Sequence, residues 1–471
     1  MVSNPYTWIF LSIFLLHLLG LLWTENIDYG IKDLRVKLPL LLLPIVIGGS
    51  QSLQKSEWQL LFKIYILTLL VLTLFSFHKL LIFKGMEVYE KRNLSIHISH
   101  IRYGLNIAFA ACLLLVSQPI FNMKISKYFF ALYFLCCLLI FELYTGLICF
   151  IAFFFIWLFI QVFDSTIKQT KRLFILLLTL AIATSGIYYV IEVYHDFARE
   201  EQLAPEAKIT KELTINGNES WTHPNDSRKI NGVKILRNVS FVELHNEWPK
   251  KSTMDLKGKD RKGQKLERTL IHFLTSKGFN KDSLAFHKLT DEEIKAIENG
   301  IPNYRYMTLN PIERRLHATF YEIDFYKNEG YVEGLSLMLR IHYWKTALKI
   351  IKDAPWYGVG TGDVETSFQQ AYEQAEQPIS EQYRRRTHNQ YLTFWVTFGL
   401  GGLLLWIFFL FSSLYKKKGD YQLIYLAFWI ISILSFIPED TLETQAGVTF
   451  FALFNVLFVL GIGNNQDQTS R

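Results

Sequence analysis

The sequence predicts an all-α polytopic integral membrane protein with about ten transmembrane helices and one large polar loop between the seventh and the eighth. Three observations predict this class. The chain of 471 residues is 51% hydrophobic and only 19% charged, which is more apolar than a soluble globular protein. Its many aromatic residues lie in runs that contain almost no charge. Most of these runs approach the length that a helix needs to cross a bilayer.

The apolar runs justify the expected helices in order along the chain. They are residues 6–23, 38–49, 58–77, 104–120, 127–141, 146–163, 172–194, 391–415, 421–437 and 446–462. The second run is short and contains Pro39 and Pro44, so we expect a broken or re-entrant element there. No basic region precedes the first run and no cleavage site follows it, which favours a retained signal-anchor.

A polar segment of about 195 residues, from His195 to about Gln390, is long enough to form a domain of its own. Its first part has mixed charge and contains "LTDEEIKAIENG", where Thr290 is placed to begin a helix and Gly300 to end it. Its second part predicts amphipathic helices. The chain therefore divides into an N-terminal bundle (1–194), an insert (195–335), an amphipathic segment (336–390) and a C-terminal bundle (391–471).

Basic residues in the short loops predict the orientation of the chain. If the polar segment is external, the basic loops at 124–127, 168–172 and 416–418 become cytoplasmic, as the positive-inside bias requires. Both termini are then cytoplasmic. The loop 78–103 is also basic but would be external, which is understandable if it binds an anionic lipid headgroup. The net charge of +7 therefore indicates cytoplasmic loops and lipid phosphates rather than nucleic acid.

Cysteine and histidine usage argues against a metal or redox centre. All four cysteines fall within apolar runs: Cys112, Cys136, Cys137 and Cys149. His97 and His100 are three residues apart, but no carboxylate or cysteine pattern accompanies them. We expect these histidines to form hydrogen bonds beside Arg102, and we expect no metal and no cofactor.

The segment "LMLRIHYWKTALKIIKD" predicts an amphipathic helix at the membrane surface. A rotation of about 100° per residue gathers its apolar side chains on one arc. These are Leu337, Ile341, Trp344, Ala347, Leu348 and Ile351. Arg340 falls within this arc, where a guanidinium must find an anion or bear a desolvation cost. A snorkelling side chain or a salt bridge would also explain it.

Two motifs follow this helix. In "APWYGVGTGD", Gly358, Gly360 and Gly362 would allow a ligand to approach the backbone, although a tight turn between helices is the simpler interpretation. In "RRRTHNQYL", a basic run and His388 precede an apolar span. Guanidinium groups suit phosphates and an imidazole suits proton transfer from a sugar hydroxyl, whereas an interfacial belt with a polar cap is the alternative.

The order of these three elements resembles the signature region of the O-antigen ligase and Wzy-type polymerase superfamily. Its members are polytopic inner-membrane glycosyltransferases with one large periplasmic loop. The resemblance covers about residues 335–405, is looser over 20–45, and includes an insert at 260–279 similar to that of Bacteroidetes members. It implies metal-independent, inverting transfer of a glycan from undecaprenyl pyrophosphate to an acceptor hydroxyl, such as that of lipid A-core, at the periplasmic face.

The resemblance also implies roles for particular residues. Arg340 and His388 match the family's catalytic positions, and His388 would act as the base. Further candidates for substrate binding are Arg102, Arg384, Arg385, Arg386, Gly358, Gly360, Gly362, Asp363 and Trp344. The family's Ser-Arg pair is missing, because the corresponding stretch reads "FELYTGLICF". Arg102 could supply this charge, and Asp363 is the competing base.

Other functions remain open at this stage. A transporter or flippase would place charges near the bilayer midplane, but within the spans only His17 is deep, while Lys63 can snorkel. A membrane-anchored binding or signalling protein would leave Arg340 and His388 without a reason. Within the enzyme class, a ligase, a polymerase and a protein O-oligosaccharyltransferase differ in the acceptor, which the sequence does not specify.

Overall fold

The computed structural model describes residues 4–84, 91–95, 98–116, 126–203, 212–223, 228–375, 379–415 and 421–462. In these residues the chain is almost entirely helical, as expected. It divides into two compact units. Unit 1 contains residues 1–76, 95–176 and 333–471, and unit 2 contains residues 77–94 and 177–332.

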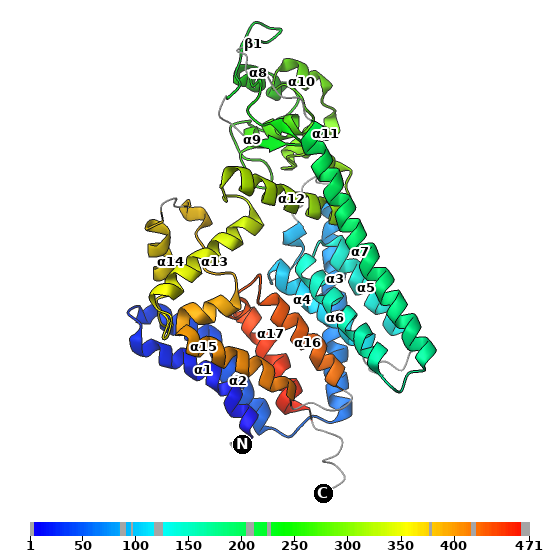
Figure 1. Cartoon of the computed structure of the whole chain (residues 1–471), viewed down its shortest axis with the longest axis vertical. Helices are drawn as coiled ribbons and strands as arrows, with labels where there is room; N and C mark the ends of the chain where they lie inside the picture. Colours follow the sequence, from blue (N-terminus) through cyan, green and yellow to red (C-terminus); the bar gives the residue numbers. More distant parts are fainter. Residues whose placement is uncertain are drawn as a thin grey trace. The chain divides into compact units, whose positions relative to one another are not determined.

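Unit 1 contains most of the apolar helices (Figure 1). They are α1 (Pro5–Leu19), α2 (Ile27–Gly49), α3 (Lys55–Lys84), α4 (His100–Val116), α5 (Ser126–Ile140), α6 (Tyr144–Phe163), α15 (Gln390–Tyr415), α16 (Gln422–Ser435) and α17 (Gln445–Val456). Residues 77–84 of α3 belong to unit 2, and helix α7 (Gln169–Leu203) likewise runs from unit 1 into unit 2. Each predicted apolar run therefore corresponds to a helix over its described residues.

By length and composition, five helices in the described chain could cross a membrane. They comprise Pro5–Trp23, Lys55–Ile82, Tyr144–Phe163, Gln169–Arg199 and Gln390–Leu414. Helices α4, α5, α16 and α17 are apolar but shorter. The core of unit 1 is aromatic, and the Phe109 ring lies 5.0 Å from that of Phe454. The composition that predicted a membrane protein is thus organised into packed apolar helices.

The expected break at 38–49 is absent. Helix α2 is continuous from Ile27 to Gly49 and contains both Pro39 and Pro44. It packs against α1 and α17. Neighbouring helices can stabilise a helix whose prolines remove backbone hydrogen bonds, and this packing explains why the prolines do not end α2.

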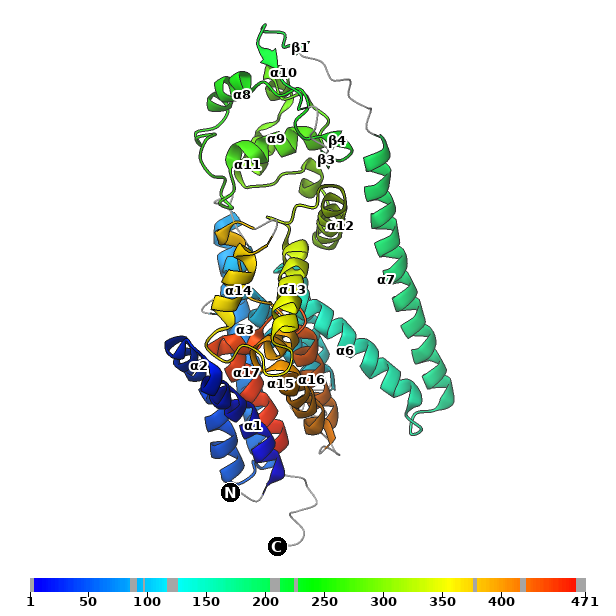
Figure 2. The same cartoon turned by 60° about the vertical axis from the view of Figure 1, so that its left-hand side comes forward.

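Unit 2 contains a small mixed domain (Figure 2). It has two antiparallel hairpins, β1 (Glu212–Leu213) with β2 (Glu219–Ser220) and β3 (Lys229–Ile230) with β4 (Val233–Lys234). Its helices are α8 (Phe241–Glu247), α9 (Leu266–Ser276), α10 (Ser283–Lys288), α11 (Asp291–Glu298) and α12 (Pro311–Glu329). Thr290 forms a capping box at the start of α11, as its sequence predicts.

The amphipathic segment forms α13 (Ser336–Asp353) and α14 (Val364–Glu373). Helix α13 packs against α14 and α15. Its buried side chains are Met338, Leu339, Tyr343, Thr346, Ala347, Ile350 and Ile351. The buried face therefore coincides only in part with the predicted apolar arc: Ala347 and Ile351 belong to both, whereas Leu348 on that arc is 50% exposed. The buried face of α13 also contains a tyrosine and a threonine, which a search for hydrophobic residues alone does not identify.

Candidate functional site

An acidic loop between α16 and α17 organises the charged residues of unit 1. It contains Glu439, Asp440 and Glu443, the last within a short 3-10 helix, Thr441–Glu443. Gln390, at the start of α15, holds this loop in place. Its backbone N–H donates to the carbonyl of Phe436 at 2.8 Å, and its side-chain oxygen accepts from the Leu442 N–H at 2.7 Å.

Arg340 lies on α13 and points its guanidinium at this loop. Its Nη2 is 3.0 Å from Glu439 Oε1, its Nε donates to the carbonyl of Pro438 at 3.1 Å, and its Nη1 donates to Ser336 Oγ at 3.3 Å. The side chain is 25% exposed. Of the interpretations that the sequence left open, the structure therefore contains the salt bridge.

His388 lies in a turn directly before α15. Its φ of 45° is in the left-handed region, which a residue with a side chain adopts only where surrounding structure holds it. Here Thr387 Oγ1 accepts from the N–H of Asn389 at 3.0 Å and donates to the carbonyl of the same residue at 2.9 Å. This turn directs His388 Nδ1 to within 3.7 Å of both Glu439 Oε2 and Asp440 Oδ1. Arg340 and His388 therefore meet at one carboxylate.

The two carboxyl groups beside His388 differ in their electrostatics. Burial would raise the pKa of Glu439, but His388 and Arg340 outweigh it and the pKa is lowered. Burial raises the pKa of Asp440 above its usual value, in spite of Arg386 and His388. Glu439 is therefore anionic at neutral pH, whereas Asp440 holds a proton more readily.

Arg102 approaches the same place from α4. It lies within electrostatic range of Glu439 and Asp440. Its Nη1 donates to Ser99 Oγ at 3.0 Å, while its buried Nε has no hydrogen-bond partner in the described part of the chain. His100 Nε2 is 3.3 Å from the carbonyl of Glu142, and His97 lies outside the described residues.

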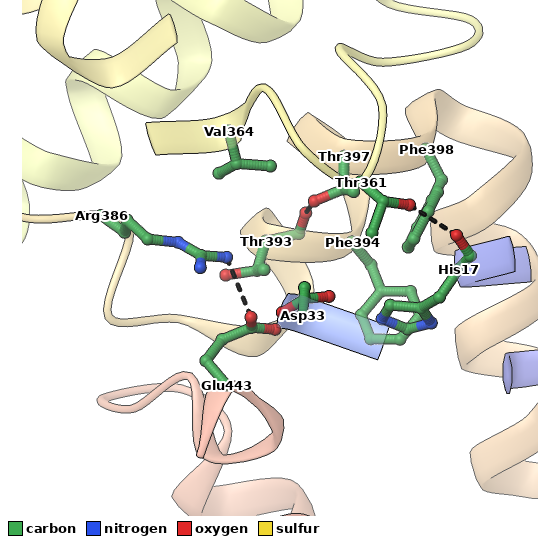
Figure 3. Close-up of a pocket in the computed structure, with 10 residues that line it drawn as sticks. All are labelled: His17, Asp33, Thr361, Val364, Arg386, Thr393, Phe394, Thr397, Phe398 and Glu443. Carbon is green, nitrogen blue, oxygen red and sulfur yellow. Dashed lines mark hydrogen bonds and ion pairs between the residues drawn. The ribbon is translucent and has the colours of Figure 1, made fainter. Parts of the chain in front are cut away.

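A second ionic cluster surrounds Glu443 (Figure 3). Its Oε2 lies 3.0 Å from Lys37 Nζ and 3.0 Å from Arg386 Nη2, and Lys37 is fully buried. Burial would raise the pKa of Glu443, but these cations keep it well below its usual value. A small cavity beside this cluster is lined by Arg386 and Glu443 on one side and by His17, Phe394 and Phe398 on the other. This ionic network holds Arg386 in place through its two Nη nitrogens, while its buried Nε has no hydrogen-bond partner within the described residues.

The glycine turn fastens α13 to the rest of unit 1. Gly360 N–H donates to the carbonyl of Thr397 at 2.9 Å, and a Cβ at Gly358 would lie 2.4 Å from the backbone of Thr397. A Cβ at Gly362 would lie 2.1 Å from the carbonyl oxygen of Asn26. The glycines of this turn thus allow close contact with the backbone of neighbouring segments of the protein, as in a tight turn between helices.

Asp363, at the end of the turn, also bonds this segment to the loop between α1 and α2. Its two carboxylate oxygens accept hydrogen bonds from the backbone N–H groups of Glu25 and Asn26, at 2.7 and 2.8 Å. Both oxygens therefore already have partners in the loop between α1 and α2.

The remaining candidates lie around this centre. Arg384 Nε donates to the carbonyl of Ile379 at 3.1 Å, and Arg385 is exposed. Tyr343 and Tyr372 fix the basic run by donating from their hydroxyls to the carbonyls of Tyr383 and Arg385, each at 2.6 Å. Within the described residues, the indole N–H of Trp344 has no hydrogen-bond partner.

Sequence reasoning missed the acidic loop. The stretch "PEDTLE" places Glu439, Asp440 and Glu443 between two apolar helices, and this density of carboxylates is the signal that was available. His388 Nδ1 and one oxygen each of Glu439 and Asp440 lie within 4.8 Å of one another, a donor set that could hold a metal ion.

The comparisons agree with the signature region. Residues 300–407 match the family model described as O-antigen ligase. This range contains Arg340, the glycine turn and His388, but not the acidic loop. No curated protein matches the chain. The resemblance predicted from the sequence is therefore confirmed over residues 300–407, where the chain is similar to the O-antigen ligase and Wzy-type superfamily.

Proposed function

We propose that this protein transfers a glycan from an undecaprenyl-pyrophosphate donor to an acceptor hydroxyl at the periplasmic face of the bacterial inner membrane. The observation that carries the proposal is the convergence of Arg340, His388 and Arg102, which come from three distant helices or their termini. A base beside a cationic clamp is a sufficient catalytic set for this reaction.

His388 acts as the base in this proposal. As the acceptor oxygen attacks the anomeric carbon, its proton passes to His388 Nε2, because Nδ1 is turned to Glu439 and Asp440. The bond between that carbon and the phosphate oxygen breaks, and its electron pair leaves with the pyrophosphate. Attack opposite the leaving group inverts the anomeric centre, and no metal takes part.

Arg340 and Arg102 stabilise the charge on the leaving pyrophosphate. A guanidinium has five N–H groups, and Arg340 uses one on each nitrogen for its present contacts. One N–H on each Nη nitrogen therefore remains for a phosphate oxygen. The donor contacts that we propose exclude the glycine turn and Asp363, because their polar groups are bonded within the protein.

We propose lipid A-core, or a similar glycolipid, as the acceptor. The test is a transfer assay with the purified full chain, an undecaprenyl-pyrophosphate oligosaccharide and lipid A-core, with a chelator present throughout. His388→Ala should lower kcat by about 100-fold or more. Asp363→Asn should retain the kcat of its folded fraction. Substantial transfer by His388→Ala, or complete loss in the chelator, would refute the mechanism. Transfer to a growing polysaccharide or to a protein would instead assign the acceptor of a polymerase or a protein O-oligosaccharyltransferase.

A further inference from the structure

Among the described residues, Glu439 is the side chain whose carboxylate contacts both proposed catalytic residues. Oε1 pairs with Arg340 Nη2 at 3.0 Å, and Oε2 lies 3.7 Å from His388 Nδ1. The side chain is 13% exposed, so water screens these interactions only weakly. One carboxylate therefore connects the donor clamp on α13 with the base before α15.

The loop geometry fixes this carboxylate between its partners. Arg340 Nε also holds the carbonyl of Pro438, the residue before Glu439. Gln390, two residues after His388, anchors the other end of the loop at Leu442. A shift of the loop would therefore move the guanidinium and the imidazole together.

The distance of 3.7 Å between His388 Nδ1 and Glu439 Oε2 is longer than a hydrogen bond. Catalytic hydrogen bonds are often long in unliganded sites and shorten in the substrate complex. When His388 accepts the acceptor's proton on Nε2, its Nδ1–H acquires a charged partner in Glu439. The carboxylate then orients the ring and stabilises the imidazolium.

We propose that Glu439 is the positioning residue of this site, orienting His388 for proton transfer while it holds Arg340 against the donor. This inference rests on the proposed function. Asp440 is the competing partner, because its Oδ1 lies at the same distance of 3.7 Å from His388 Nδ1. The geometry favours Glu439, since within the described residues Arg340 forms its ion pair with Glu439 and none with Asp440.

The charged and titratable groups around His388 come from several elements. Glu439 and Asp440 belong to the acidic loop, and Arg340 and Tyr343 belong to α13, with the Tyr343 ring 5.7 Å from the imidazole. Further from the ring, Arg386 and Glu443 interact electrostatically with Asp440, and Arg102 interacts electrostatically with both Glu439 and Asp440. The Glu439→Gln variant keeps all of these other groups. A change in the pH dependence of its transfer rate can therefore be assigned to the loss of the Glu439 carboxylate.

The experiment measures transfer by the full chain as a function of pH. Glu439→Gln should lower kcat by about 10-fold or more and raise the donor KM, because His388 and Arg340 both lose the carboxylate that orients them. The acid limb of the pH–rate profile should move to lower pH by about one unit, because a neighbouring anion stabilises protonated imidazole. A purely structural role would reduce the folded fraction without moving this limb.

Matched variants separate the possible results. Glu267→Gln removes another carboxylate–histidine pair, the 3.1 Å contact with His245 in unit 2, and should leave kcat and the pH limb unchanged. Asp440→Asn should leave the acid limb in place. If Asp440→Asn moves the limb and Glu439→Gln does not, Asp440 is the partner and the proposal is wrong.

Two further outcomes are decisive. If Glu439→Gln does not accumulate, Glu439→Asp decides: the parental acid limb with a reduced kcat supports the proposal, and a parental kcat overturns it. Activity that a chelator abolishes and one divalent ion restores would make His388, Glu439 and Asp440 metal ligands and would also overturn it. Loss of transfer in His388→Ala with parental behaviour of Glu439→Gln refutes this inference alone, whereas an active His388→Ala refutes the proposed function.

Discussion

At the residue scale, the site depends on side chains whose charges are matched across distant segments. Arg340 was predicted from one helix, where it falls among apolar residues. Its partner Glu439 lies in a loop that follows the next-but-one apolar run, and no periodicity in the sequence relates the two. The sequence predicted that Arg340 could form a salt bridge, but only the folded structure identifies Glu439 as the partner.

The geometry of Arg340 leads to a prediction about shape rather than charge. Arg340→Lys keeps the positive charge but loses the planar fork that bonds Ser336, Pro438 and Glu439 together. We expect transfer to fall by about 10-fold or more while the protein accumulates normally in the membrane. A radiolabelled-donor assay on equal amounts of protein measures this. Near-normal transfer by Arg340→Ala would remove Arg340 from the proposed mechanism.

Glu243 is a buried carboxyl group of unit 2 that accepts several hydrogen bonds. It is 2% exposed and accepts hydrogen bonds from Thr214, Asn218 and the backbone N–H of Ser283. Burial would raise the pKa of Glu243, but these bonds outweigh it and lower the pKa from 4.5 to about 2.

A carboxyl group whose folded pKa is lowered stabilises the fold above its unfolded pKa. This contribution, about 3 kcal/mol, should therefore be complete above pH 4.5 and fall away towards pH 2. Proteolysis within residues 228–330 of the full chain should increase over this range. Glu243→Gln should be cleaved faster already at neutral pH, and equal rates for the two proteins at pH 7 would contradict the assignment.

At the scale of elements, the glycine turn and α15 form one joint. Helix α15 contains a kink at Gly399, where φ is 67° and a Cβ would lie 2.1 Å from the backbone of Trp356. The N–H of Leu400 donates to the carbonyl of Pro355 at 2.8 Å, so the end of α13 is fixed to this kink. This joint sets where Arg340 and His388 lie relative to each other.

Gly399→Ala should therefore destabilise unit 1 by at least about 2 kcal/mol, through a left-handed backbone and a clash. Gly401, in the same helix, has open space around its Cβ position, so Gly401→Ala is the matched control and should be neutral or stabilising. Thermal unfolding in detergent measures both variants. Equal unfolding midpoints would show that the joint can relax.

The positions of the helices were predicted better from the sequence than the faces on which they pack. Apolar runs and caps located the helices because hydrophobic length and local hydrogen bonding are local properties, as in α11 with Thr290. The continuity of α2 through Pro39 and Pro44 depends on α1 and α17, and the buried face of α13 depends on α14 and α15. These tertiary contacts lie beyond what a single window of sequence contains.

At the scale of the whole molecule, the sequence located the signature but only part of its environment. The region of Arg340 and His388 was recognised from its order of motifs, and the family model matches it at 300–407. The acidic loop lies outside this range and is typical, by composition, of a connection between two helices. Its contacts with α13 and with the start of α15 are formed only in the folded structure, where Arg340 bonds to Pro438 and Gln390 to Phe436.

The orientation of the chain in the membrane is the remaining prediction at this scale. The basic stretch at 168–172, which lies at the start of α7 rather than in a loop, predicts a cytoplasmic position, whereas the lysines at 416–418 lie outside the described residues. Unit 2 contains the polar domain and would then be periplasmic. The proposed reaction requires this orientation, because the lipid-linked donor must present its glycan on the side where His388 lies.

Cysteine labelling tests the orientation directly. In a Cys136→Ser background, which removes the exposed native thiol, Thr253→Cys and Lys171→Cys place single exposed thiols in unit 2 and in the first turn of α7. We expect an impermeant maleimide to label position 253 in cells whose outer membrane has been opened, and to label position 171 only after the inner membrane is disrupted. The three remaining cysteines are buried and should stay unlabelled in the folded protein, which provides the background control. The reverse pattern would place the polar domain in the cytoplasm and exclude periplasmic glycan transfer at this site.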